Sequence, residues 1–164
     1  MKRIVLLSLL LSLGFAQSTQ NKVGLGSPLA TFTAKFGAPF RNVGKYLYDY
    51  QKCPGRSQLA QWSVTSEDGA LATVITHNAC PPNKLDASTS DAQAKLFFPS
   101  DAVQARTFRT GDGWAAQAFR SETLGRTFPP EFFKSCEGTE PLGTFSYLLS
   151  PERAMWMMAL GTCL

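Results

Sequence analysis

The segment CPGRSQLAQWSVTSEDGALATVITHNAC, residues 53–80, is a predicted β-hairpin enclosed by two cysteines. Two β-prone runs flank the Glu-Asp-Gly sequence at 67–69, which is a strong turn signal. The same interval between cysteines recurs in CEGTEPLGTFSYLLSPERAMWMMALGTC, residues 136–163, where two apolar runs flank a turn at 150–153. We therefore expect two antiparallel hairpins, each clamped at its open end.

The N-terminus has the layout of a secretory signal peptide. A basic start, MKR, precedes the apolar run IVLLSLLLSLGF, and small residues follow at Gly14 and Ala16. This run is shorter than the roughly 20 apolar residues that cross a bilayer, and no later stretch is long and apolar enough. We expect residues 1–16 to be removed on export, leaving a periplasmic or secreted chain without a membrane span.

Four cysteines in an exported chain predict two disulfides. The sequence alone permits three pairings, and the equal intervals favour Cys53–Cys80 together with Cys136–Cys163. The chain has no C-x-x-C motif, and its single histidine, His77, has no second ligand group near it in the sequence. We therefore expect structural disulfides, with neither a metal nor a cofactor.

The two cysteine-bounded segments also share residues when one is placed on the other at an offset of 83. Five of the 28 positions are identical, including both cysteines. The other three matches are Gly55 with Gly138, Leu59 with Leu142 and Ser63 with Ser146. Trp62 and Val64 fall on Phe145 and Tyr147, which are similar in kind. This pattern favours one hairpin unit that is used twice.

Outside the hairpins, the first half predicts one helix and one strand. The stretch GSPLATFTAKFGAP, residues 26–39, has Ser27 as a candidate N-cap, Pro28 at the first helical position and a glycine and a proline at its end. The stretch KYLYDYQK, residues 45–52, alternates with the period of a strand.

The second half predicts a helical stretch at 91–97, a short helix that Ser100 caps, and a strand after the turn at 111–113. A polar, turn-rich link at 81–91 is the best candidate boundary. We divide the mature chain into a first helix-plus-hairpin unit at 17–83 and a second unit at 84–164, which share one compact globule.

The expected fold class is α+β. It consists of an antiparallel sheet of disulfide-clamped hairpins, with short helices on one face, arranged as a degenerate tandem repeat.

The stretch VGLGSPLATFTAKFGAP, residues 23–39, resembles the start of β-lactamase-inhibitor-protein-like proteins and of outer-membrane assembly lipoproteins of similar fold. The shared pattern is a glycine, a capped helix and Gly-x-Pro before the first strand. The inhibitor proteins carry two tandem helix-plus-sheet units, each with a disulfide. The resemblance implies a binding role for a concave sheet face, without catalysis.

The charge of the chain does not favour nucleic-acid binding. The precursor has 16 Lys and Arg against 12 Asp and Glu, and loss of Lys2 and Arg3 with the signal leaves a net charge of +2. The remaining basic residues are scattered singly, whereas nucleic-acid surfaces cluster them.

Catalytic motifs are not found in the sequence. A Ser-His-Asp arrangement would have to use His77, and no G-x-S-x-G supplies its nucleophile. A pair of carboxylates that meet only in space stays open as an alternative. We interpret His77 as structural or solvent-facing.

Aromatic residues give the best candidate binding site. Tyr46, Tyr48 and Tyr50 lie on one face of the predicted strand, and Trp62 lies on its neighbour. Tyr and Trp are favoured at interfaces because they are large, stiff and partly polar. The alternative is that these rings fill the core.

The sequence therefore predicts an exported, non-enzymatic binding protein whose partner is a protein or another component of the cell envelope. A hydrolase built on a carboxylate pair and a structural envelope component are the alternatives.

Overall fold

The computed structural model describes residues 22–67, 69–136 and 138–163. The predicted signal peptide, residues 1–16, and Asp68 of the first predicted turn lie outside this part of the chain. No helix within it has the length and apolar character needed to cross a bilayer.

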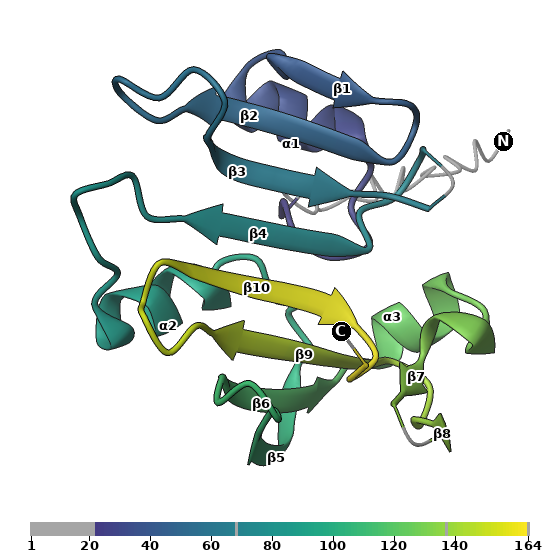
Figure 1. Cartoon of the computed structure of the whole chain (residues 1–164). Helices are drawn as coiled ribbons and strands as arrows, with labels where there is room; N and C mark the ends of the chain where they lie inside the picture. The colour runs from purple at the N-terminus through teal and green to yellow at the C-terminus, as the bar shows by residue number, and fades with distance from the viewer. Residues whose placement is uncertain (1–21, 68, 137, 164) are drawn as a thin grey trace, which may run out of the picture.

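The chain forms short helices and a large antiparallel sheet (Figure 1). The elements of the first half are α1 (Leu29–Phe36), β1 (Arg41–Val43), β2 (Leu47–Lys52), β3 (Ala60–Thr65) and β4 (Val74–Asn78). Those of the second half are α2 (Ala87–Lys95), β5 (Val103–Arg109), β6 (Ala115–Arg120), α3 (Glu122–Thr127), the 3-10 turn η1 (Pro130–Phe132), β7 (Lys134–Ser135), β8 (Gly138–Thr139), β9 (Thr144–Leu149) and β10 (Met155–Leu160).

Eight strands pair in the order β1-β2-β3-β4-β10-β9-β6-β5, and β7 and β8 form a separate ribbon. In the described chain each half contributes a helix and four antiparallel strands to this layered arrangement, and the second half adds α3, η1 and the β7–β8 ribbon between β6 and β9. The last strands of the two halves, β4 and β10, pair at the centre of the sheet. The expected α+β class, with disulfide-clamped hairpins in one antiparallel sheet, is confirmed. The 83/84 boundary falls in the connection between β4 and α2.

The central pairing has an approximate two-fold symmetry that matches the sequence offset of 83. Ile75 pairs with Met158, which is its equivalent at this offset. The neighbouring pairs Val74–Ala159 and Thr76–Met157 exchange with each other under the same offset. The offset therefore relates residues that occupy the same place in the two halves.

Alternation of side chains along the strands places the core on one face of the sheet. In β3, Ala60, Trp62 and Val64 are buried and the residues between them are half-buried. Helices α1 and α2 cover the face that carries Trp62 (Figure 1). The fully buried large side chains include Trp156, Tyr50, Phe32, Phe133 and Phe145.

Two local predictions are wrong. Ser27 does not cap α1, whose N-cap is Pro28. The Ser27 hydroxyl instead accepts from the Gly24 N–H and donates to the Lys22 carbonyl. The stretch after Ser100 is strand β5 rather than a helix, because its residues pair along β6. Tertiary pairing there overrides a local capping signal.

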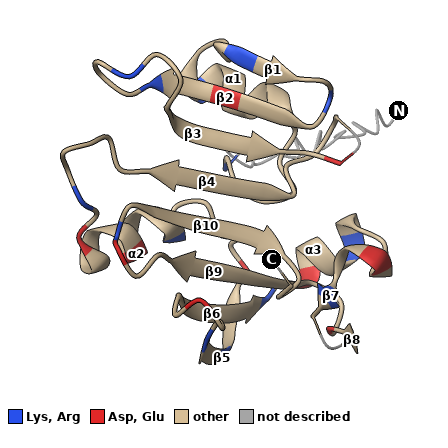
Figure 2. Cartoon of the chain, viewed as in Figure 1, with Lys and Arg blue, Asp and Glu red and all other residues tan. Residues whose placement is uncertain are grey.

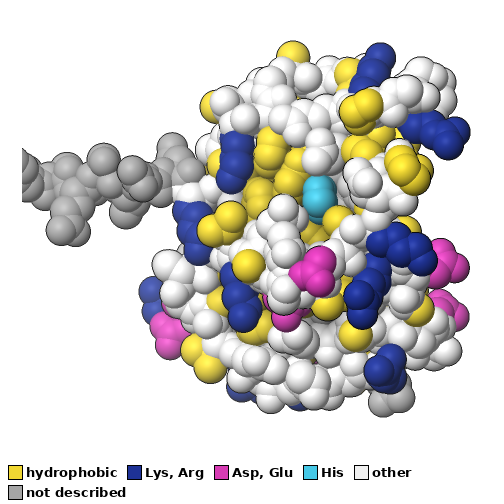
Figure 3. Space-filling model, turned by 90° about the vertical axis from the view of Figure 1, so that its left-hand side faces the viewer, with side chains coloured by type: hydrophobic (Ala, Val, Ile, Leu, Met, Phe, Trp, Pro, Cys, Tyr) yellow, Lys and Arg dark blue, Asp and Glu magenta, His cyan; other side chains and the backbone are white. Residues whose placement is uncertain are grey.

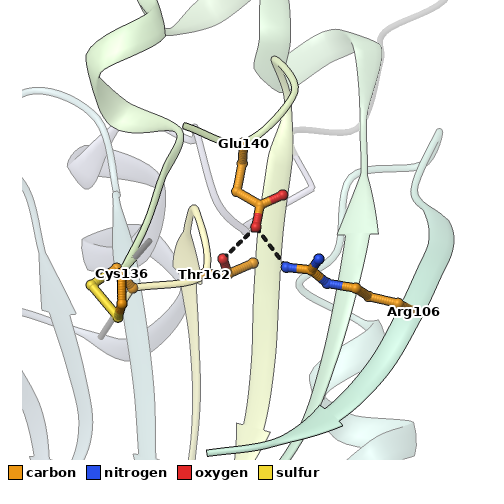
Figure 4. Close-up of a disulfide and its surroundings, with 5 residues drawn as sticks. Arg106, Cys136, Glu140 and Thr162 are labelled. Carbon is orange, nitrogen blue, oxygen red and sulfur yellow. Dashed lines mark hydrogen bonds and ion pairs between the residues drawn. A yellow bond between two sulfur atoms is a disulfide. The ribbon is translucent and has the colours of Figure 1, made fainter. Parts of the chain in front are cut away.

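The two disulfides are Cys53–Cys80 and Cys136–Cys163, as the equal intervals predict. The first closes the β3–β4 hairpin and the second encloses β9 and β10. Near the second bond, Glu140 accepts hydrogen bonds from Arg106 of β5, at 2.6 Å, and from the Thr162 hydroxyl, at 2.7 Å (Figure 4). Through Glu140, which directly follows β8, these hydrogen bonds connect the edge strand β5 with the C-terminal segment.

The equal loop lengths allow a matched comparison of the two disulfides. In the chain-entropy model, C53A/C80A and C136A/C163A each lose about 3 to 4 kcal/mol of unfolding free energy, because both bonds close loops of the same length. Only C53A/C80A should change the environment of Trp62, since this bond lies at the ends of β2 and β4. Urea unfolding followed by tryptophan fluorescence checks both points. Equal spectral changes in the two variants would contradict the second.

Candidate functional site

The four predicted binding residues do not form one exposed platform. Tyr46 is 61% exposed in the β1–β2 turn, and Tyr48 is half-buried, with its hydroxyl donating to the Lys45 carbonyl. Tyr50 is fully buried and Trp62 is 8% exposed. For these two residues the structure supports the alternative that the rings fill the core, because α1 packs on their face of the sheet. A binding role for the four residues stays a prediction.

None of the described helices lies on the opposite face of the sheet (Figure 1). Asp49 lies on it, almost fully buried, and accepts hydrogen bonds from Arg41 at 2.5 Å and from the Ser63 hydroxyl at 2.6 Å. This network satisfies a carboxylate that would otherwise be buried without a partner. Asp49 therefore has a structural role on that face.

The charged residues of the sheet lie in its outer strands, β1, β2, β5 and β6 (Figure 2). Strands β3, β4, β9 and β10 contain no Lys, Arg, Asp or Glu. The centre of the molecule is thus held by apolar and aromatic packing, and the functional question is where this packing reaches the surface.

The aromatic packing of the core reaches the surface in a hollow at one end of the helix-covered face. We call it the His77 hollow and define it by Phe36, Trp62, His77, Phe97 and Trp156. Figure 3 shows the histidine at its bottom, among hydrophobic side chains. The ring of Trp62 lies 4.2 Å from His77, 4.9 Å from Phe36 and 5.0 Å from Phe97, between centroids.

Separate elements bring these rings together. Trp62, His77 and Trp156 face one another across β3, β4 and β10, where Trp62 and Trp156 both pair with His77. Phe36 is the last residue of α1, and Phe97 follows α2. The Cys53–Cys80 disulfide and a hydrogen bond from Asn78 to the Ala60 carbonyl, at 2.9 Å, fix the nearby strand ends.

The imidazole of His77 is 5% exposed, and its Nδ1 has no hydrogen-bond partner within the described ranges. Burial among aromatic rings lowers the pKa of His77 from 6.5 to about 4, because desolvation disfavours the charged form. His77 is therefore neutral at pH 7. The indole Nε1 of Trp156 is also buried without a partner.

The rim of the hollow carries a cation. Lys35 is exposed, and its Nζ lies 4.6 Å from the centre of the Phe97 ring and 5.6 Å from that of Phe36. A separate groove of about 1100 Å³ beside α1 includes Lys35 and Phe97, but Phe36, Trp62, His77 and Trp156 do not line it.

The opposite end of the same face is covered by the chain itself. There the offset of 83 puts Leu160 in the place of His77, and Phe145 in the place of Trp62. The β6–β9 connection, residues 121–143, contains α3 and adds Leu124, Phe128 and Phe133 to the hydrophobic core.

Helix α3 reaches as far as the start of α1. A Cβ on Gly26, whose φ is +76°, would lie only 3.0 Å from Leu124. The β2–β3 connection, residues 53–59, is the equivalent segment of the first half and forms no helix. Among the described residues, the His77 hollow therefore lies at the end of the core that has no equivalent of α3.

The most buried carboxylate, Asp49, and two others pair with structural groups rather than with one another. Besides Asp49 and Glu140, Asp101 accepts from the Ser121 hydroxyl and the Thr123 N–H at the start of α3. Within the described ranges, no three His, Cys, Asp or Glu residues form a group that could hold a metal. No observation favours the hydrolase alternative.

Sequence reasoning placed Trp62 in the site but missed His77, Phe36, Phe97 and Trp156. The offset of 83 could have drawn attention to His77, because it aligns this histidine with Leu160, an apolar residue in the second hairpin.

No protein-family model, no curated protein and no solved structure matches this chain. The likeness to β-lactamase-inhibitor-protein-like proteins stays an expectation, and the argument for function depends on the site alone.

The pKa of His77 predicts how stability depends on pH. The unfolded chain takes up a proton near pH 6.5 and the folded chain only near pH 4. Stability is thus fully present above pH 6.5 and falls between pH 6.5 and pH 4, by about 2 kcal/mol, since the exposed edge of the ring keeps some solvation.

Urea unfolding at pH 7 and pH 4 measures this loss. His77→Leu introduces the residue found at the equivalent position of the second half. Its fall in unfolding free energy over this pH interval should be smaller than that of the unchanged chain by the amount attributed to His77. An identical pH dependence in the variant would contradict the assignment.

Proposed function

We propose that the chain is an exported, non-enzymatic binding protein of the cell envelope or the extracellular space, and that the His77 hollow is its binding site. Its partner is a protein or another envelope component. Two disulfides support a place outside the reducing cytoplasm.

The observation that carries the proposal is the uncovered aromatic end of the core. In the second half, α3 adds Leu124 to the core, whereas the equivalent connection of the first half has no helix and the histidine is visible at the surface among hydrophobic side chains. Aromatic anchors in a preformed concave site are typical of binding surfaces.

The surroundings of His77 favour binding over catalysis. A histidine acting as general base in a Ser-His-Asp arrangement donates its Nδ1 proton to a carboxylate, which orients the ring. The Nδ1 of His77 has no such partner within the described residues, and the nearest rings are those of Trp62 and Trp156.

Affinity capture tests the proposal. The oxidised chain from Gln17 to Leu164 is exposed to envelope extract and culture medium, and bound material is identified by mass spectrometry. We expect one stoichiometric partner, whose capture falls at least tenfold with Phe36→Ser because this half-buried ring forms the rim of the hollow.

Phe132→Ser is the matched control. Phe132 is also half-buried but packs on Phe128, beyond the hollow. Equal capture by the two variants would contradict the site, and loss of capture with Tyr46→Ser alone would place the partner at the β1–β2 turn. Firm attachment to cell walls without a stoichiometric partner would favour a structural envelope component.

A further inference from the structure

We infer that the Cys136–Cys163 disulfide is a thiol-exchange site, which an exported oxidoreductase with a C-x-x-C motif reduces while the Cys53–Cys80 disulfide stays closed. The inference goes beyond the proposed function and shares with it only the expectation of export.

The two disulfides differ in their exposure. Cys136 and Cys163 are both exposed. Cys53 is only 2% exposed, and Cys80 is half-buried. Exchange requires a thiolate to reach a sulfur of the bond, and exposed disulfides are typically the labile ones. The second disulfide is therefore the one that a reductant reaches in the folded chain.

The second disulfide also lies outside the large sheet. Cys136 is in the turn between β7 and β8, and Cys163 follows β10. A cleft of about 670 Å³ between the β7–β8 ribbon and the edge strand β5 is lined by Cys136, Arg106 and Glu140, among others. This cleft gives a reductant an approach to Cys136 that does not require the sheet to open.

The reductant must come from outside the chain. All four cysteines are held in the two disulfides, so the chain has no thiol of its own. A C-x-x-C protein supplies two thiols, and the pKa of the attacking one is lowered, which favours the reactive thiolate. A reductant with a single thiol would leave a mixed disulfide instead of two free cysteines.

The exchange proceeds in two balanced steps. A thiolate of the oxidoreductase attacks one sulfur of the bond, forms a mixed disulfide and releases the other cysteine as a thiolate, which takes up a proton. The second thiol of the oxidoreductase, deprotonated, then attacks the mixed disulfide and releases the second cysteine. Two electrons and two protons pass to the chain, and the C-x-x-C motif becomes a disulfide.

Reduction should loosen the C-terminal segment and leave the sheet paired. Strand β10 lies between β4 and β9 and pairs with both. Beyond it, the N–H groups of Thr162 and Cys163 donate to the Lys134 carbonyl, at 2.8 and 3.2 Å, and the Thr162 hydroxyl donates to Glu140. Without the disulfide, only such hydrogen bonds hold this segment, which is then free to open locally.

Limited reduction tests the selectivity. The oxidised chain from Gln17 to Leu164 is incubated with dithiothreitol, free thiols are blocked with iodoacetamide at intervals, and peptide mapping locates them. We expect Cys136 and Cys163 to be labelled at least about tenfold faster than Cys53 and Cys80. Both bonds have a sequence separation of 27, so loop length does not account for a difference. In denaturing urea the difference should vanish.

A trapping reductant tests the class of partner. A thioredoxin whose second active-site cysteine is replaced by serine stops after the first step. We expect its mixed disulfide on Cys136 or Cys163. C53A/C80A should give as much adduct as the unchanged chain, and C136A/C163A should give none.

Hydrogen exchange tests the structural consequence. In the selectively reduced chain, the amide of Thr162 should exchange about tenfold faster than in the oxidised chain, and the amides of β10 should keep their protection. C136A/C163A, which lacks the bond without alkylation, should show the same change.

Four outcomes would overturn the inference: equal labelling rates in the folded chain, simultaneous opening of both bonds, an adduct on Cys53 or Cys80, or no adduct at all. Unchanged exchange at Thr162 would contradict the loosening of the C-terminal segment. None of these results would affect the proposed function, because the His77 hollow contains neither Cys136 nor Cys163.

Discussion

The pairing of β4 with β10 is the constraint on which the rest of the structure depends. These two strands carry no charged residue, and they join two halves that are each a helix and four antiparallel strands. Because Ile75 and Met158 pair across the seam and are equivalent in sequence, the two halves extend from it in opposite directions. The seam makes one sheet of eight strands, so that both helices cover the same face and share one core.

The candidate site arises where the symmetry of the two halves breaks. The connection at 121–143 supplies α3 and η1, and the equivalent connection at 53–59 is held at its start by the Cys53–Cys80 disulfide. The core of the second half therefore gains a helical segment, whereas in the first half Trp62 and His77 keep 8% and 5% of their surface exposed.

Much of the architecture could be predicted from the sequence because it depends on local rules. The equal cysteine intervals gave the two disulfides, turn residues marked the hairpins, and alternation in β3 and around Tyr48 marked strands. Local signals were insufficient for β5, which is an exposed edge strand whose partner, β6, decides its conformation. Local signals were also insufficient for Ser27. Its hydroxyl does not cap α1 but forms hydrogen bonds with Gly24 and Lys22 in the loop before this helix.

The sequence by itself determined the fold class, the disulfide pairing and the chemistry available, since these follow from residue type and spacing. Only the tertiary structure decided which face of the sheet is covered. The sequences around Tyr50 and Trp62 alternate with the period of two that an exposed stripe would have. Because this period is the same for either face of a sheet, it does not show which face is exposed. Helix packing, which depends on residues far apart in the chain, buried Tyr50 and left Trp62 beside His77 at the open end of the core.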